Sequence, residues 1–238
     1  FNNRLASLFD AAGQRVITQY LKGDAAELEK RRYYNANNND YDVYVRMFEV
    51  AVKLVTPDNL YYQNLIRVKL HYFTGVAARL KIPVTVKEKQ KALIEKAFAE
   101  QKKALALEEH APYIYNELGI LYSYKKMDKE AEANFKTAAA RAPNWSLPLV
   151  NLSDLYAAND KLDLAILYAD SAKELQPGFQ DLYLGYGIIN EKKAKLLQAE
   201  EAFQKSIKLN NRHFLPFERL GYVYMNTMQF PEADSMFF

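Results

Sequence analysis

The sequence predicts an all-α protein, a solenoid of antiparallel helix pairs. Similar residues recur every 34 positions along its second half, which is the stride of a helix–turn–helix repeat. Small and large residues alternate within each period, and prolines stand where the second helix of a pair would end. Five series keep this spacing without a slip: Gly119, Ser153, Gly187 and Gly221; Ala131, Ala165, Ala199 and Ala233; Phe135, Ala169, Phe203 and Phe237; Tyr122, Tyr156, Asn190 and Tyr224; Tyr115, Leu149, Tyr183 and Phe217.

The residues of each repeat have separate packing roles. Small residues such as Gly119 lie where the two helices approach closely, because a large side chain would push the backbones apart. Large residues such as Phe135 fill the space that remains. Pro143 and Pro177 end the second helix, since proline disfavours helical conformation at the preceding residue, and Asn211 holds the third equivalent place.

The repeats of the second half have boundaries that follow from this spacing. They are 112–145, 146–179, 180–213 and a truncated repeat at 214–238. The last repeat stops in the middle of its second helix, where Met236, Phe237 and Phe238 would leave an apolar stripe open. Because solenoids normally end in a polar capping helix, we expect the natural chain to continue or this helix to dock on something.

The N-terminal third follows the pattern less closely. Ala97 and Ala104 hold second-helix positions of an enlarged repeat with an 18-residue insertion. A degenerate repeat precedes it, with a helix that begins at Asp24 and a capping box completed by Glu27. A polar turn is expected at 35–40. The predicted segments are a leading helix at 1–25, the degenerate repeat at 26–59 and the enlarged repeat at 60–111.

The pattern Tyr115-x-x-Leu118-Gly119-x-x-Tyr122…Ala131…Phe135…Ala138…Pro143 resembles the tetratricopeptide repeat, TPR, over residues 112–238. The resemblance implies a right-handed superhelical solenoid whose first helices line a concave face. It also implies a protein–protein interaction scaffold, with a protein or peptide as the partner.

Composition argues against several classes of function. The chain has 238 residues, of which 26% are charged, and a formal net charge of +3, so net charge predicts neither nucleic-acid binding nor membrane binding. It has no cysteine, which excludes disulfides, thiolate metal sites and cysteine nucleophiles. No apolar run approaches the roughly 18 residues that span a bilayer. We expect a soluble protein, cytoplasmic or periplasmic.

The polar residues show no catalytic pattern. His71, His110 and His213 have no metal-ligand spacing relative to one another. Gly185-Tyr186-Gly187 lacks the third glycine of a phosphate-binding loop and lies within a repeat's first helix. The sequence therefore predicts no enzyme, no cofactor and no metal.

Partner-binding candidates follow from the resemblance, because TPR proteins bind ligands at set positions of the first helices. These are Tyr113, Asn116, Ile120, Tyr124, Val150, Asn151, Asp154, Leu184, Ile188, Glu218, Arg219 and Tyr222. Asn151 stands where such grooves use an asparagine to hold a peptide backbone. It is the only match to the carboxylate clamp of chaperone-binding TPR proteins, so a chaperone tail is disfavoured.

The enlarged repeat supplies a second candidate surface. If its extra helical length projects from the stack, apolar side chains are exposed and form a contact site. The alternative is that the hairpin folds back on the leading helices and buries them. The side chains concerned are Tyr72, Phe73, Val76, Leu80, Ile82 and Val84.

Three functional hypotheses remain open from the sequence. The first is a non-catalytic adaptor with a concave peptide groove. The second is a regulatory or docking region of a larger multidomain enzyme, for example a bacterial peptidase, since the stretch Leu8 to Leu21 is faintly similar to the start of the repeat arrays that follow such domains. The third is a scaffold that self-associates through the truncated last repeat.

Overall fold

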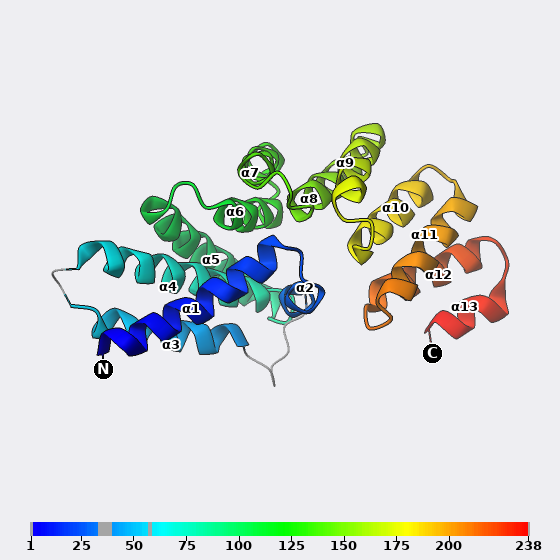
Figure 1. Ribbon diagram of the computed structural model, residues 1–238. Helices are drawn as coiled ribbons and strands as arrows, with labels where there is room; N and C mark the ends of the chain where they lie inside the picture. The colour runs from blue at the N-terminus through cyan, green and yellow to red at the C-terminus, as the bar shows by residue number, and fades with distance from the viewer. Residues whose placement is uncertain (1, 33–39, 57–58, 238) are drawn as a thin grey trace. The chain divides into compact units, whose positions relative to one another are not determined.

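The computed structural model describes residues 2–32, 40–56 and 59–237, and these residues form thirteen helices and no strand (Figure 1). The polar turn predicted at 35–40 falls almost entirely outside the described residues. The chain divides into an N-terminal unit, Phe1–Pro143, and a C-terminal unit, Asn144–Phe238. The fold is all-α, as the sequence predicts.

The helices of the N-terminal unit are α1 (Asn2–Leu21), α2 (Ala25–Arg32), α3 (Asp40–Leu54), α4 (Leu60–Leu80), α5 (Lys87–Leu107), α6 (Pro112–Tyr124) and α7 (Asp128–Arg141). Those of the C-terminal unit are α8 (Leu147–Ala158), α9 (Leu162–Leu175), α10 (Gln180–Lys192), α11 (Leu196–Leu209), α12 (Phe214–Asn226) and α13 (Phe230–Phe237). In each 34-residue period a first helix packs against the second helix that follows it.

The close approach of paired helices explains two of the residue series, the one that begins at Gly119 and the one that begins at Phe135. A Cβ atom added at Gly119 would lie 2.5 Å from the Phe135 ring, and one at Gly187 would lie 2.3 Å from the Phe203 ring. The glycine thus provides the space that the phenylalanine of the partner helix occupies. In the repeat at 146–179 both positions differ. Ser153 stands at the glycine position and is larger, and Ala169 stands at the phenylalanine position and is smaller.

The turn between paired helices has its own constant position. Lys126, Asp160, Ala194 and Met228 adopt left-handed backbone conformations, with φ between 56° and 61°, and they too are 34 residues apart. This conformation favours glycine, yet none of the four is glycine. The series was not predicted, because its members share a backbone angle and no side-chain chemistry.

The leading helices pair differently from the prediction. A Cβ at Gly13 of α1 would lie 2.5 Å from the Phe48 ring of α3, which is the same glycine–aromatic contact as in the later repeats. α3 therefore pairs with α1, and α2 is an inserted helix between the two in sequence. The boundary predicted between 25 and 26 cuts through this pair, so the segments 1–25 and 26–59 are not separate packing units.

The capping box predicted for α2 is half correct. The Asp24 side chain accepts a hydrogen bond from the Glu27 backbone N–H at 2.9 Å and so caps the helix. The Glu27 carboxylate does not return to the Asp24 backbone. It instead accepts hydrogen bonds from Arg31 Nε and from the Tyr41 hydroxyl, each at 2.7 Å.

The enlarged hairpin, α4 and α5, folds back on the leading helices. The second-surface prediction is therefore wrong for five of its six residues, and the alternative of burial is correct. Phe73 of α4, for example, stacks on Phe48 and Tyr44 of α3, with ring centroids 5.6 and 4.9 Å apart. The buried residues are Tyr72, Phe73, Val76, Leu80 and Ile82, and only Val84, in the turn, is exposed among the six.

Candidate functional site

The candidates on α6 do not form an open groove. Tyr113 is 6% exposed and Asn116 is fully buried, whereas Ile120 is half-buried and Tyr124 is exposed. Tyr113 packs edge-on against Tyr72 at 4.7 Å, and its hydroxyl donates to Glu108 at 2.8 Å. The chain's own helices cover Tyr113 and Asn116, so these two are not available to a partner in this conformation.

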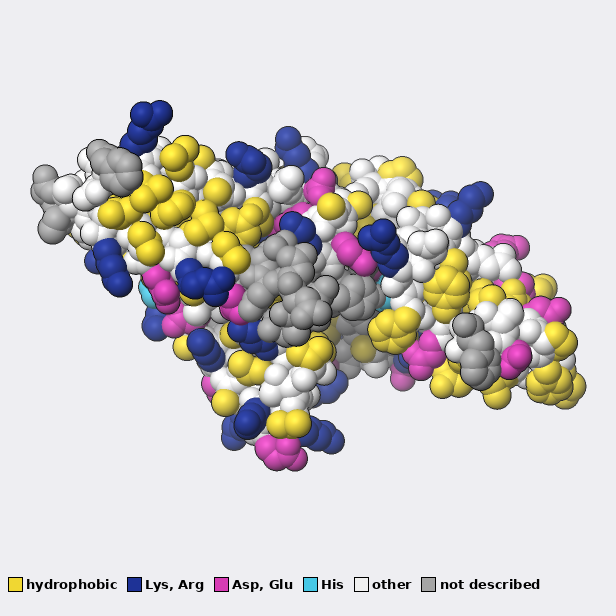
Figure 2. Space-filling model, turned by 90° about the horizontal axis from the view of Figure 1, so that it is seen from below, with side chains coloured by type: hydrophobic (Ala, Val, Ile, Leu, Met, Phe, Trp, Pro, Cys, Tyr) yellow, Lys and Arg dark blue, Asp and Glu magenta, His cyan; other side chains and the backbone are white. Residues whose placement is uncertain are grey.

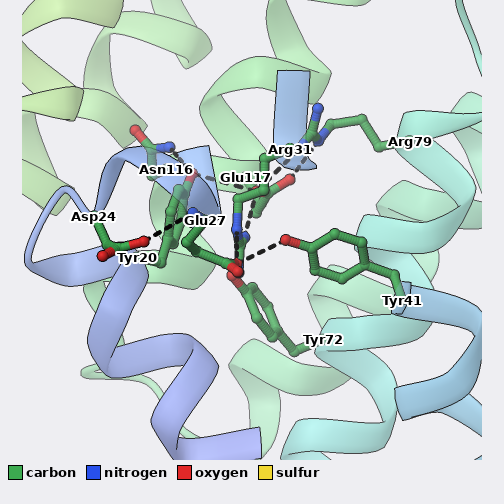
Figure 3. Close-up of polar contacts among 9 residues, drawn as sticks. All are labelled: Tyr20, Asp24, Glu27, Arg31, Tyr41, Tyr72, Arg79, Asn116 and Glu117. Carbon is green, nitrogen blue, oxygen red and sulfur yellow. Dashed lines mark hydrogen bonds and ion pairs between the residues drawn. The ribbon is translucent and has the colours of Figure 1, made fainter. Parts of the chain in front are cut away.

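A buried polar cluster takes the place of a groove on this face (Figure 3). We call it the arginine cluster. It joins five helices: Tyr20 comes from α1, Glu27 and Arg31 from α2, Tyr41 from α3, Tyr72 and Arg79 from α4, and Asn116 and Glu117 from α6. All eight side chains are buried. Two arginines face two glutamates, so the charges of these eight residues balance.

Arg31 lies at the centre of the cluster. Its guanidinium carbon is 3.5 Å from the centroid of the Tyr20 ring, which is cation–π distance, and its Nη1 donates to the Tyr72 hydroxyl at 2.6 Å. The same Nη1 lies 3.4 Å from Glu117 Oε1. Arg31 Nη2 is buried and has no hydrogen-bond partner among the described residues.

Two ion pairs anchor the cluster from different elements. Glu27 and Arg31 pair within α2, at i and i+4, with Oε1 and Nε 2.7 Å apart. Arg79 of α4 pairs with Glu117 of α6, with Nε and Oε2 2.5 Å apart. Asn116 Nδ2 donates to the Tyr20 hydroxyl at 2.9 Å, which orients that ring over Arg31.

Burial decides the protonation of these groups. It raises the pKa of Tyr20 and of Tyr72, so both hydroxyls stay protonated. Burial alone would lower the pKa of Arg31, but the nearby tyrosines and Glu27 raise it well above its usual value. Tyr20 and Tyr72 are thus hydroxyl donors and acceptors at neutral pH, and Arg31 is a cation.

The remaining candidates belong to the C-terminal unit. They lie on the first helices α8, α10 and α12, which contact one another in that order. We call these positions the first-helix face. Val150 and Leu184 are buried, Asn151, Ile188, Glu218 and Arg219 are half-buried, and Asp154 and Tyr222 are exposed.

The carboxylate of Asp154 lies beside α10, where the Asp181 carboxylate acts on it electrostatically. Asp154 Oδ1 lies 3.4 Å from where a Cβ of Gly185 would stand, so the missing side chain leaves room for it beside α10. The surrounding protein and the nearby Asp181 carboxylate raise the pKa of Asp154 to about 7, although its side chain is exposed. Further along the face, Arg219 Nη1 lies 3.7 Å from Glu191 Oε2. A positively charged group beside Asp154 and Asp181 would relieve their repulsion.

Exposed apolar surface occurs away from these candidates. In the N-terminal unit, Leu8 of α1 is 61% exposed and Val43 and Val50 of α3 are each 44% exposed. Figure 2 shows hydrophobic side chains gathered along this α1–α3 face. The sequence did not predict it, because the pairing of α1 with α3 was not foreseen.

Sequence reasoning also missed the arginine cluster. Arg31 and Glu27 stand in a strongly charged stretch, Glu27 to Arg32, which is typical of a solvated helix face. A signal was present: Glu27 and Arg31 are four residues apart, and Glu117 and Asn116 occupy ligand-facing positions of a first helix. Only the fold brings them together.

In 2–32, 40–56 and 59–237 no three His, Asp or Glu side chains are placed to hold a metal ion. Among these residues no helix combines the length and the apolar character needed to cross a membrane.

The fold is similar to several solved structures. A tetratricopeptide repeat protein from Parabacteroides merdae matches over 93% of this chain and 77% of its own, with a TM-score of 0.60 and 14% identity. A thermophilic TPR protein from Thermus thermophilus matches over 67% of this chain and 87% of its own, with a TM-score of 0.57 and 18% identity. A chain of the APC/C hetero-tetramer Cut9–Hcn1 matches over 84% of this chain and 42% of its own, with a TM-score of 0.58 and 16% identity. No protein-family model and no curated protein matches the sequence.

Proposed function

The chain has the tetratricopeptide-repeat fold, and from this premise we propose that it is a non-catalytic protein–protein interaction scaffold. Helix-pair solenoids expose the outward positions of successive first helices as one extended surface, which suits a peptide or a partner protein. A structurally similar chain is part of the APC/C hetero-tetramer Cut9–Hcn1.

We place the partner on the first-helix face of the C-terminal unit. The observation that carries this choice is exposure: Tyr222 is 45% exposed and Asp154 is exposed, whereas Tyr113 and Asn116 of the N-terminal unit are covered. Tyr222 presents an aromatic anchor of the type enriched at binding hot spots. We propose that Asn151, which is half-buried on α8, holds the backbone of the peptide.

The charge of this face indicates the chemistry of the partner. Asp154 and Asp181 repel each other, while Arg219 is already close to Glu191. A partner that brings a lysine or arginine beside Asp154, together with an apolar residue for Tyr222, would satisfy both features. We therefore propose a basic peptide segment with an apolar anchor as the ligand class.

A peptide library tests this proposal. Selection on the intact chain should enrich peptides that combine a basic residue with an aromatic or aliphatic one. Asp154→Asn should weaken the enriched peptide at least about tenfold, the effect of losing one well-placed charge contact of about 1.4 kcal/mol. Glu174→Gln is the matched control, because it makes the same chemical change at an exposed position of the second helix α9.

Two results would count against the proposal. Equal binding by wild type, Asp154→Asn and Tyr222→Ala would remove the first-helix face from the account. Enrichment of acidic peptides would contradict the ligand class and leave the face itself in place.

A further inference from the structure

The arginine cluster consists of two groups that are each neutral. Glu27 and Arg31 pair within α2 at 2.7 Å, and Arg79 and Glu117 pair between α4 and α6 at 2.5 Å. The ionic contact between the two groups, Arg31 Nη1 to Glu117 Oε1, is longer, at 3.4 Å. If α2 left the cluster, it would carry its own counter-charge with it. Glu117 would keep Arg79, so neither of these two would stay buried as an unpaired charge.

Few apolar contacts among the described residues hold α2 in place. Leu28 is the only buried apolar residue among the described side chains of this eight-residue helix. The polar contacts of α2 include the hydrogen bonds of Glu27 with Tyr41 and of Arg31 with Tyr72, and Glu29 and Lys30 make further contacts. A helix this short does not persist alone in water, so α2 exists as a helix because it is docked. Its release would expose little apolar surface, which favours opening well below global unfolding.

The surface beneath α2 is shaped for a guanidinium group. Without α2, the rings of Tyr20, Tyr41 and Tyr72 would surround an opening with the Glu117 carboxylate beside it. The distances from these rings to the Arg31 guanidinium carbon are 3.5, 5.3 and 5.6 Å, all within the range of cation–π attraction. Arg31 Nη2, buried without a partner among the described residues, shows that the internal occupant leaves one donor unsatisfied there.

We propose that this surface of the N-terminal unit is a binding site for an arginine presented on a short helix, and that α2 is its internal, displaceable occupant. A partner helix with a Glu-x-x-x-Arg pair would bind by replacing α2 and would reach the otherwise covered Asn116 and Glu117. The site is independent of the first-helix face of the C-terminal unit, so either proposal can fail alone.

Hydrogen–deuterium exchange on the intact chain tests the release of α2. The amides of α2 should exchange at least about tenfold faster than the core amides of α4 and α6, because α2 opens locally. Tyr41→Phe removes one hydrogen bond to α2 and keeps the ring, so it should accelerate α2 exchange further. Tyr113→Phe is the control, since it removes a comparable hydroxyl whose partner, Glu108, lies outside α2. Exchange of α2 as slow as that of α4 and α6 would overturn the proposal.

A peptide in trans tests the arginine specificity. The probe is a capped synthetic peptide of residues 24–32, used at several millimolar, because a tethered segment has an effective concentration on the order of millimolar. It should accelerate exchange of the internal α2 at least about fivefold, and a peptide with Arg31→Gln should not. Equal effects of the two peptides, or no effect of either, would overturn the assignment of a guanidinium site.

Discussion

Two glycines of α10 give a sharp test of how the helix pairs pack. Gly185 and Gly187 lie two residues apart in the same helix, and both are buried. Replacing either with alanine gains helix propensity of about 1 kcal/mol. At Gly185 the new Cβ meets, among the described residues, only Asp154 Oδ1, at 3.4 Å, the distance of an ordinary contact. We therefore expect Gly185→Ala to be neutral or to stabilise the protein by up to about 1 kcal/mol.

Gly187→Ala should behave in the opposite way. Its Cβ would lie 2.3, 2.4 and 2.8 Å from three atoms of the Phe203 ring. Phe203 is fully buried and cannot swing into solvent, so α10 and α11 must separate or the ring must leave its rotamer. Overpacking of this kind costs about 1–3 kcal/mol, which exceeds or cancels the propensity gain.

The assay is urea unfolding of both variants beside the wild type, followed by circular dichroism. The free energy of unfolding of Gly187→Ala should be about 1–3 kcal/mol below that of Gly185→Ala, since the propensity gain is common to both and cancels. Equal stabilities of the two variants would mean that the helices of a pair are not in contact at the glycine position.

Three further predictions concern the C-terminal unit. Ala169→Phe alone should destabilise it by about 1–3 kcal/mol, and adding Ser153→Gly should recover most of that loss in a double-mutant cycle, since the pair then matches the other repeats. Ala194→Gly should stabilise by up to about 1 kcal/mol in thermal unfolding, because Ala194 has φ 56°. Asp154, whose pKa is raised in the folded state, should contribute stability that is complete below about pH 4 and is lost as the pH rises through about 7. Asp154→Asn should lack that dependence in unfolding measured from pH 5 to 8, with a modest amplitude because the side chain is exposed.

Regular spacing explains what could be predicted from the sequence. The glycine at 119 and the phenylalanine at 135 are 16 residues apart, as are Gly187 and Phe203, and the structure shows why each pair is small on one helix and large on the other. Because the spacing is constant, residues at equivalent positions make equivalent contacts between paired helices. The fold class and the helix pairing of the second half can therefore be predicted from the sequence.

Insertions explain what could not be predicted. Gly13 and Phe48 form the same contact, but the insertion of α2 separates them by 35 residues, so no fixed spacing reveals the pair. The sequence pattern predicts α1 as a lone leading helix, and it therefore predicts α2 as the partner of α3. This prediction does not give the observed position of α2 in the arginine cluster.

Burial of charge was the second obstacle. Charged residues are usually exposed, and the stretch around Arg31 gave no reason to expect otherwise. Asn116 was expected in a groove because it faces outward from α6 by register. In the structure the Asn116 side chain is covered by α1, because its Nδ2 donates a hydrogen bond to the Tyr20 hydroxyl. The helix face on which a residue lies can thus be predicted from the sequence. Whether that residue is buried depends on contacts between segments that are distant in the chain.

Exchange footprinting with a bound peptide shows whether a partner binds at the first-helix face. The basic peptide selected on the intact chain would be added at saturation, and amide exchange compared with and without it. We expect slower exchange in α8, α10 and α12 of the C-terminal unit when the peptide is bound. Slowing confined to α9, α11 and α13, the second helices of the same repeats, would contradict it.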